Sequence, residues 1–169
     1  MTVRICFVCS GNICRSPTAE VVMRRLVADA GLAGEVEVCS AGIGAWHAGN
    51  AADPRSAAAM RAHGYDPSGH RARQVTRQDL VDHELVVAMD RGHLRDLERM
   101  LPLGSECEVR LLLSYGPSSA VLDVLDVPDP YYGGPSGFDD VLAMIERACR
   151  GLLDEVRRRE AGPAASTDR

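Results

Sequence analysis

The chain alternates short apolar runs with longer amphipathic stretches. Four runs rich in β-branched residues predict buried strands, in the order VRICFVC, EVEVCSAG, HELVVAMD and ECEVRLLL. Apolar residues recur at helical spacing between these runs and again near the end of the chain, where one face of residues 137–160 carries Phe138, Leu142, Ile145, Cys149, Leu152 and Leu153. Strands that alternate with helices predict an α/β fold with a parallel sheet and right-handed crossovers.

Capping residues mark where the helices begin. Ser16 followed by Pro17 predicts an N-cap and a first helical residue directly after the first strand. Asp53, which also precedes a proline, and Asp90 predict the N-caps of two later helices. Residues 114–136 are rich in Pro, Gly, Asp and Tyr, so we expect a long functional loop there.

Composition limits the class of protein. With 169 residues, 46% of them hydrophobic, the chain is expected to form one domain over residues 1–160, followed by a disordered tail at 161–169. A net charge of −5 argues against nucleic acid as a partner. No apolar run approaches the roughly 20 residues of a membrane helix, and no signal-peptide pattern is recognised. We therefore expect a cytoplasmic protein, not associated with membranes, with reduced cysteines.

The segment CSGNICRSP stands between the first predicted strand and the first predicted helix. A loop at this position gathers backbone N–H groups that have no helical partner, at the positive end of the helix dipole, and so forms an anion site. Gly11 lets the chain wrap tightly, and Asn12 tolerates a left-handed conformation. Arg15 adds a planar fork for two phosphate oxygens. The pattern predicts a phosphate-binding loop.

Cys9 lies at the entrance of this loop. Thiols at helix N-termini and beside cations are reactive as thiolates at neutral pH, and the Ser16 hydroxyl is placed to donate a hydrogen bond to the sulfur. A phosphate held over such a nucleophile indicates covalent phosphoryl transfer.

Other uses of the cysteines are less compatible with the pattern. Cys6 and Cys9 match the C-x-x-C redox spacing, but Cys6 lies inside the predicted strand, so the two side chains point to opposite faces. No second C-x-x-C and no paired His follows at ligand spacing, so no metal site is expected. The loop also lacks the Gly-Lys-Ser/Thr of a nucleotide-binding P-loop.

CSGNICRSPTAE resembles the Cys-x5-Arg-Ser signature of the low-molecular-weight protein tyrosine phosphatases. The segments SAG (Ser40–Gly42), HRAR (His70–Arg73), AMDRGHLRDL (Ala88–Leu97) and DPYY (Asp129–Tyr132) occur in the order and spacing of that family. The resemblance covers nearly the whole chain. The fold we expect is a single α/β domain with a central four-stranded parallel sheet in the order 2-1-3-4, helices on both faces and the phosphate-binding loop after strand 1.

The resemblance implies the catalytic roles. Cys9 attacks phosphorus, Arg15 binds the phosphoryl oxygens, and Asp129 is the general acid and then the general base. A phenolate leaving group does require a proton, which a carboxylic acid can supply. From the residues alone, Asp129 before Pro130 is equally compatible with the start of a turn.

Further roles are implied around the loop. Residues of the loop bind the substrate's phosphate (Ser10, Gly11, Asn12, Ile13, Cys14, Ser16). Tyr131 and Tyr132 form a wall of the cleft, and Trp46 contacts the substrate's ring, although a hydrophobic anchor is an equal alternative for Trp46. Ser40 and His70 hold the loop through Asn12. Cys14 is a redox residue that pairs with Cys9 under peroxide, or alternatively a small buried side chain.

The predicted function is hydrolysis of phosphotyrosine through a cysteinyl-phosphate, without cofactor or metal. The expected partners are phosphotyrosine proteins or peptides, with inorganic phosphate as product and a monomer or weak dimer as the working form. One alternative is a protein-arginine phosphatase, whose family members tend to carry Thr where this chain has Ile13. A thiol-coupled arsenate reductase would need relay cysteines, and the middle of the chain offers only Cys107. A non-catalytic phosphate-binding or redox-sensing module would need neither thiol nor acid.

Overall fold

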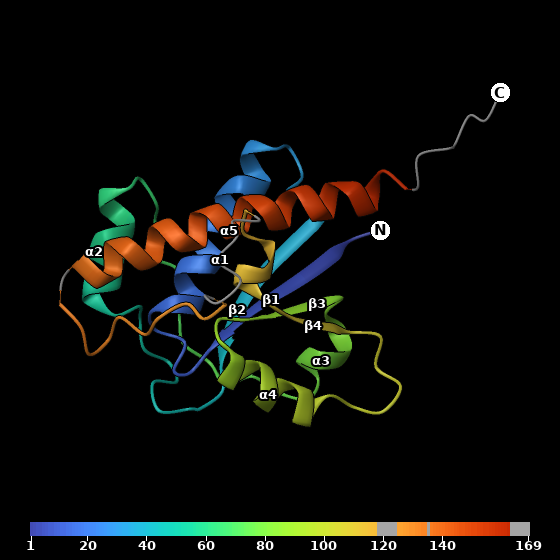
Figure 1. Ribbon diagram of the computed structural model, residues 1–169, viewed down its shortest axis with the longest axis horizontal. Coiled ribbons are helices and arrows are strands. Elements are labelled where there is room, and N and C mark those ends of the chain that lie inside the picture. Colours follow the sequence, from blue (N-terminus) through green and yellow to red (C-terminus); the bar gives the residue numbers. More distant parts are fainter. Residues whose placement is uncertain (118–124, 135, 163–169) are drawn as a thin grey trace.

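The computed structural model describes residues 1–117, 125–134 and 136–162 (Figure 1). Four parallel strands form one sheet in the order β2-β1-β3-β4, as predicted. The strands are β1 (Val3–Cys9), β2 (Val36–Gly42), β3 (Leu85–Ala88) and β4 (Glu108–Leu111). Strand β1 is central and pairs with both β2 and β3, so its carboxyl end lies where the strand order reverses. Ligands bind at such positions in open α/β sheets.

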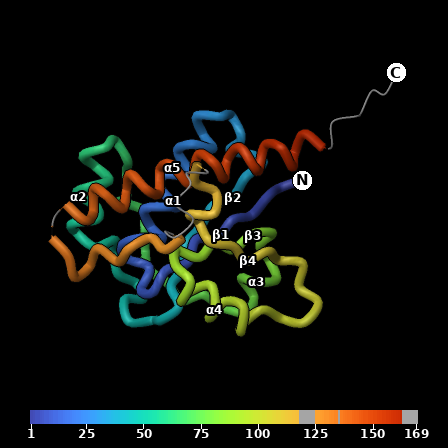
Figure 2. Tube along the Cα trace, in the orientation of Figure 1, coloured from blue at the N-terminus to red at the C-terminus, as the bar shows by residue number. Residues whose placement is uncertain are grey.

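Helices cover both faces of the sheet (Figures 1 and 2). The long helix α5 runs across one face together with α1, and α4 lies on the other side with the short α3. The helices are α1 (Arg15–Asp29), α2 (Pro54–Ala62), α3 (Asp79–Asp82), α4 (Arg91–Met100) and α5 (Ser136–Glu160), and a 3₁₀ turn, η1, spans Leu112–Tyr115. The α/β class with helices on both faces is confirmed.

Strand β1 supplies residues to two separate cores. Ile5, Phe7 and Cys9 face α1 and α5, whereas Cys6 and Val8 face α3 and α4. The prediction that Cys6 and Cys9 point to opposite faces is therefore confirmed. The apolar face predicted for the last helix is buried throughout, from Phe138 to Leu153. A strand buried on both sides explains why its sequence is apolar without alternation.

One predicted helix boundary is wrong. Helix α1 begins at Arg15 with Cys14 at the N-cap, so Ser16 lies inside the first turn and Pro17 is the third helical residue. The Ser16 hydroxyl does not cap the helix because it is used in contacts with the preceding loop. The caps predicted for α2 and α4 are confirmed, since Asp53 and Asp90 each accept a hydrogen bond from a backbone N–H of the helix that follows.

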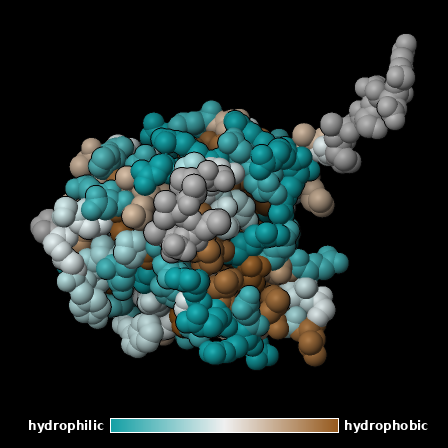
Figure 3. Space-filling model, viewed as in Figure 1, coloured by the Kyte–Doolittle hydropathy of each residue, from teal (hydrophilic) through white to brown (hydrophobic). Residues whose placement is uncertain are grey.

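Most of the predicted tail, residues 163–169, lies outside the described residues. Within the described ranges, no helix combines the length and apolar character needed to cross a membrane. The face seen in Figure 3 is mostly hydrophilic, with hydrophobic residues gathered in the region of α4 and β4. The domain assignment over residues 1–160 stays a prediction.

Candidate active site

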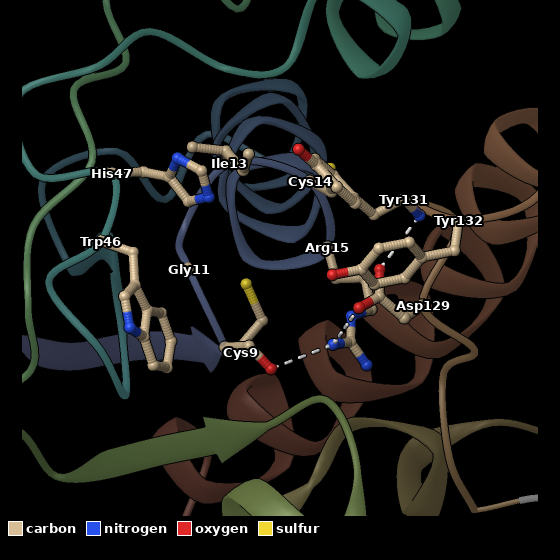
Figure 4. Close-up of a pocket in the computed structure, with 11 residues that line it drawn as sticks. Cys9, Gly11, Ile13, Cys14, Arg15, Trp46, His47, Asp129, Tyr131 and Tyr132 are labelled. Carbon is tan, nitrogen blue, oxygen red and sulfur yellow. Dashed lines mark hydrogen bonds and ion pairs between the residues drawn. The ribbon is translucent and has the colours of Figure 1, made fainter.

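A pocket of about 400 Å³ opens at the end of β1, where the chain turns into α1 (Figure 4). It brings together residues from three distant parts of the sequence. Its lining consists of Cys9, Ser10, Gly11, Ile13, Cys14, Arg15, Trp46, His47, Asp129, Tyr131 and Tyr132. The structure thus places the predicted nucleophile, phosphate-binding arginine and acid around one space. Asn12 and Ser16 lie behind the lining, and His47 is a lining residue that the sequence analysis did not single out.

The loop after β1 is held in a tight turn. Asn12 has a φ of 59°, and among the described residues it is the only one other than glycine with a left-handed backbone. The Cys9 and Ser10 carbonyls accept hydrogen bonds from the Ile43 and Gly44 N–H groups, at 2.8 and 3.0 Å. These bonds tie the loop to the segment that follows β2.

The Asn12 side chain points away from the pocket into the protein. Its amide nitrogen donates to Ser16 Oγ at 2.8 Å and to Ser40 Oγ at 2.9 Å, and its amide oxygen accepts from the Arg73 N–H at 3.0 Å. Asn12 is fully buried. Its side chain therefore fixes the shape of the loop, and Asn12 is not among the residues that line the pocket, so its binding of phosphate stays a prediction.

His70 and Glu20 complete the support of the loop. His70 Nε2 lies 2.7 Å from the Asn12 carbonyl oxygen, and its Nδ1 lies 3.6 Å from a Glu20 carboxylate oxygen. Glu20 also accepts a short hydrogen bond from the Ser40 hydroxyl. Burial alone would raise the pKa of Glu20, but hydrogen bonds from His70 and Ser40 outweigh it and lower that pKa. Sequence analysis missed Glu20 because nothing marks it among the other residues of an amphipathic helix.

Cys9 is almost fully buried, and its sulfur points into the pocket (Figure 4). Cys9 Sγ lies 2.9 Å from Ser16 Oγ. Because Asn12 donates to Ser16 Oγ, the single proton of the Ser16 hydroxyl is left for one of two acceptors, Cys9 Sγ at 2.9 Å or the Ala41 carbonyl oxygen at 3.2 Å. The start of α1 adds the positive end of a helix dipole beside the same sulfur. The sulfur of Cys9 therefore lies beside both the Ser16 hydroxyl and the first turn of α1.

The Arg15 guanidinium is fixed on the floor of the pocket and is only 4% exposed. Its Nη1 donates to Asp90 Oδ2 at 2.9 Å and to the Val127 carbonyl at 3.0 Å. Its Nη2 lies 3.4 Å from Ser10 Oγ and 3.5 Å from Asp129 Oδ2. Nη1 is thus used for anchoring, while Nη2 faces the pocket.

Asp129 lines the pocket opposite Trp46 (Figure 4). Its Oδ1 accepts a hydrogen bond from the Tyr131 N–H at 3.0 Å, which is the turn interaction expected before a proline. Its Oδ2 faces Arg15, and its side chain is 41% exposed. The turn and the position in the pocket are therefore compatible, because each uses a different carboxylate oxygen.

His93 is a buried pocket neighbour that the sequence analysis did not identify. Its Nε2 lies 2.8 Å from Ser10 Oγ, and its Nδ1 lies 3.2 Å from Asp90 Oδ1. Burial, assisted by Arg15, outweighs Asp90 and lowers the pKa of His93 to about 4. His93 is therefore neutral at physiological pH. It links Ser10 of the loop to the start of α4.

Aromatic side chains form the rim of the pocket. Trp46 is 73% exposed and Tyr132 is 89% exposed, so Trp46 is not a hydrophobic anchor beneath its loop. Tyr131 and Tyr132 meet edge to face with ring centroids 4.9 Å apart. The Arg55 guanidinium lies 5.1 Å from the Tyr131 ring centroid and donates to the Tyr131 carbonyl oxygen, which stabilises this wall.

Cys14 also lines the pocket but is buried against Ala59 and Phe138. Burial, together with the nearby carboxylate of Asp53, raises the pKa of the Cys14 thiol to about 12. Cys14 is thus a protonated thiol beside the loop that carries Cys9. A disulfide between Cys9 and Cys14 stays a prediction.

Comparisons with known proteins agree with this arrangement. The family described as low molecular weight phosphotyrosine protein phosphatase matches residues 4–161. A low molecular weight protein-tyrosine-phosphatase from Streptomyces coelicolor is 54% identical over 98% of this chain and 100% of its own length. The crystal structure of YfkJ from Bacillus subtilis superimposes with a TM-score of 0.86 at 38% identity, covering 95% of this chain and 98% of that one.

A solved structure described as an arginine phosphatase from Drosophila is also similar. It has a TM-score of 0.83 at 31% identity and covers 91% of this chain and 98% of its own. Proteins with this fold are thus described either as tyrosine phosphatases or as an arginine phosphatase. With the family match over nearly its full length, and with Cys9, Arg15 and Asp129 around one pocket, the chain belongs to the low molecular weight phosphotyrosine protein phosphatase family.

Proposed function

We propose that this protein hydrolyses phosphotyrosine in proteins or peptides through a covalent phosphocysteine on Cys9. The observation that carries the proposal is the grouping of the Cys9 sulfur, the Arg15 Nη2 and the Asp129 carboxylate around one pocket of about 400 Å³. A phosphoryl group bound by Arg15 and by the loop N–H groups lies over the sulfur. These donors supply the charge stabilisation of phosphoryl transfer, so no metal ion is required.

The first step transfers the phosphoryl group to the enzyme. Cys9 Sγ attacks phosphorus, the bond from phosphorus to the phenolic oxygen breaks, and protonated Asp129 gives its proton to that oxygen. Asp129 Oδ2 lies 3.5 Å from Arg15 Nη2. When a phosphate dianion binds, Arg15 Nη2 pairs with the phosphate in place of Asp129, and Asp129 is then free to contact the leaving group.

The second step regenerates the enzyme. Asp129, now a carboxylate, removes a proton from water as the water oxygen attacks phosphorus. The bond from sulfur to phosphorus breaks, inorganic phosphate is formed and Cys9 leaves as a thiolate. The Ser16 hydroxyl, 2.9 Å from Cys9 Sγ, stabilises that leaving thiolate.

The rim of the pocket favours an aromatic leaving group. Ile13, Trp46 and the two tyrosines present an apolar slot above the phosphate site. A flat phenyl ring can stack between such walls, whereas a guanidinium would require acceptors for its N–H groups. Among the described lining residues, Asp129 is the one with a carboxylate. Because Asp129 is proposed to be the general acid, it is not available as an acceptor for a guanidinium.

The test is metal-free phosphate release from matched peptides that carry phosphotyrosine, phosphoserine or phosphoarginine. We expect release from the phosphotyrosine peptide alone, with loss of at least ~10³-fold in Cys9→Ser. Cys9→Ser keeps the loop donors and Arg15, so it still binds phosphate. Preferential release from phosphoarginine would assign the alternative specificity. Turnover by Cys9→Ser would exclude the covalent mechanism.

A further inference from the structure

A second group of reactive side chains lies on the face of the sheet opposite Cys9. Cys6 and Cys39 are neighbours in the register of β1 and β2, so both side chains project from the same face. His83 follows α3 and lies beside them. Cys6 Sγ, Cys39 Sγ and His83 Nε2 all lie within 4.8 Å of one another, and Cys39 Sγ is 3.2 Å from His83 Nε2.

The His83 ring is oriented by its backbone contact. Its Nδ1 lies 2.8 Å from the Asp79 carbonyl oxygen, an acceptor only, so Nδ1 carries the proton and donates it. In the neutral ring the lone pair is then on Nε2, which faces the two sulfurs. Histidines that bind metals are oriented in this way, with the second ring nitrogen donating to a carbonyl or carboxylate.

The charges around the group suit a divalent ion. Arg73 Nη2 lies 3.5 Å from Cys39 Sγ and 3.8 Å from Cys6 Sγ, but Arg73 is itself paired with the Asp79 carboxylate at 2.9 and 3.0 Å. Its charge is therefore compensated. Two thiolates would balance the two charges of the metal ion, and Arg73 would remain as a hydrogen-bond donor to the sulfurs.

We propose that Cys6, Cys39 and His83 form a binding site for Zn²⁺ or a similar thiophilic ion. Tetrahedral zinc with sulfur and nitrogen ligands has ligand–ligand distances of about 3.5–3.8 Å. The widest of the three separations, at most 4.8 Å, would therefore close by about 1.3 Å or less, and the 3.2 Å between Cys39 Sγ and His83 Nε2 would open by about 0.3 Å or slightly more. Water fills the fourth position. Binding forms two Zn–S bonds and one Zn–N bond and releases the two thiol protons to solvent.

The position of the group allows an ion to enter. Strand β2 is at the edge of the sheet, and Cys39 and His83 are partly exposed, with 14% of the His83 side chain exposed, whereas Cys6 is fully buried. The ligands come from β1, β2 and the segment between α3 and β3. No metal site was predicted from the sequence, because these three ligands are far apart in the chain and meet only through the pairing of β1 with β2 and the position of the segment after α3.

A bound ion would join strands β1 and β2 to the segment between α3 and β3 without entering the pocket of Cys9. Because an ion that binds only the folded state lowers the fraction unfolded by mass action, free Zn²⁺ at 100 times its Kd lowers the unfolding equilibrium constant about 100-fold. The site is therefore detectable by stability and by spectroscopy, independently of any phosphatase activity.

The test uses the double variant Cys9→Ser, Cys14→Ser, which removes the thiols of the pocket. Titration with Co²⁺ should give one equivalent of tetrahedral complex with thiolate-to-cobalt charge-transfer absorption, and Zn²⁺ should displace it and raise the Tm. Adding Cys39→Ser or His83→Gln should abolish the tetrahedral spectrum. Adding Cys107→Ser, a buried cysteine of the same core, should leave it unchanged.

Circular dichroism of each variant controls for folding. The proposal is overturned if the folded double variant gives no tetrahedral cobalt spectrum, or if Cys39→Ser and His83→Gln both retain it. Because these proteins lack the Cys9 thiol, neither result depends on the proposed phosphatase function. Failure of the substrate test with an intact cobalt spectrum would equally leave the metal site standing.

Discussion

Asp90 uses its two carboxylate oxygens on two different elements, and one of them is the anchor of Arg15. Oδ2 accepts a hydrogen bond from Arg15 Nη1 at 2.9 Å, while Oδ1 accepts one from the His93 N–H at 2.9 Å and caps α4. The sequence analysis treated Asp90 chiefly as a helix cap. The structure gives it both roles, so the start of α4 fixes the guanidinium of the pocket.

The two roles of Asp90 can be separated by substitution. Asn is as good an N-cap as Asp, so Asp90→Asn should be about 1 kcal/mol more stable to urea than Asp90→Ala. Both variants lose the charged anchor of Arg15, and both should bind phosphate and phosphotyrosine peptide about tenfold more weakly or worse. Wild-type KM in Asp90→Asn would show that the Val127 carbonyl alone fixes Arg15.

Asp129 is expected to act on the leaving group. Asp129→Asn removes the proton donor and should lower kcat by about 10²–10³-fold for phenyl phosphates with poor leaving groups, and far less for nitrophenyl phosphate. Asp126→Asn is the matched control, because Asp126 is in the same segment but pairs with Arg91 outside the pocket. An equal loss of kcat for every leaving group would assign Asp129 to the turn alone.

Gly42 ends β2 directly beneath the phosphate-binding loop. A Cβ at this position would lie 2.9 Å from the Ser10 carbonyl oxygen and 3.0 Å from the Asn12 nitrogen, both backbone atoms. Gly42→Ala should therefore displace the loop, costing about 1–3 kcal/mol of stability and about tenfold or more in kcat/KM. Gly34→Ala, whose Cβ meets nothing within 4 Å, should leave kcat/KM unchanged. Equal kinetics in the two variants would contradict a tight fit under the loop.

His93 should make folding sensitive to mild acid. Its pKa falls from 6.5 in the unfolded chain to about 4 in the folded protein, so between these values the unfolded state binds a proton that the folded state does not. Stability is therefore complete above pH 6.5 and is lost as the pH falls towards 4, by up to about 3 kcal/mol.

His93→Gln provides the comparison for this pH effect, because carboxylates of the protein also lose stability in acid. Urea unfolding of both proteins from pH 7 to 4 isolates the contribution of the imidazole. The variant should lose less stability than the wild type over this range. Parallel curves would show that the pKa of His93 does not differ between the folded and the unfolded protein.

The sheet could be predicted because its strands are short apolar runs and because the phosphate-binding loop has a local signature. The boundaries of β1 match the predicted run from Val3 to Cys9. The predicted start of α1 was wrong by two residues, because Ser16 has the residue type of a cap but its hydroxyl is engaged by Cys9 and Asn12. That competition depends on a loop conformation which no local pattern encodes.

The supporting contacts of the pocket were hardest to predict. The Val127 carbonyl contacts Arg15 and Glu20 contacts Ser40 from positions that carry no distinctive pattern. His93 lies in the segment Ala88–Leu97 that carries the family resemblance, but its contact with Ser10 became known only with the fold. Cys6, Cys39 and His83 likewise meet only because separate strands place them together. Long-range contacts of this kind follow from the register of the sheet, which becomes known only with the fold.

The anchoring of Arg15 by Asp90 and Val127 has a consequence for how this enzyme can diversify. In the proposed mechanism, phosphate is bound by backbone groups and by Arg15, which is fixed in the interior, whereas the leaving group lies against Trp46 and Tyr132, which are exposed. The two recognition tasks therefore draw on separate parts of the molecule. Substitutions at the rim are therefore expected to change which phosphorylated substrate is preferred, without altering the residues proposed to break the ester bond.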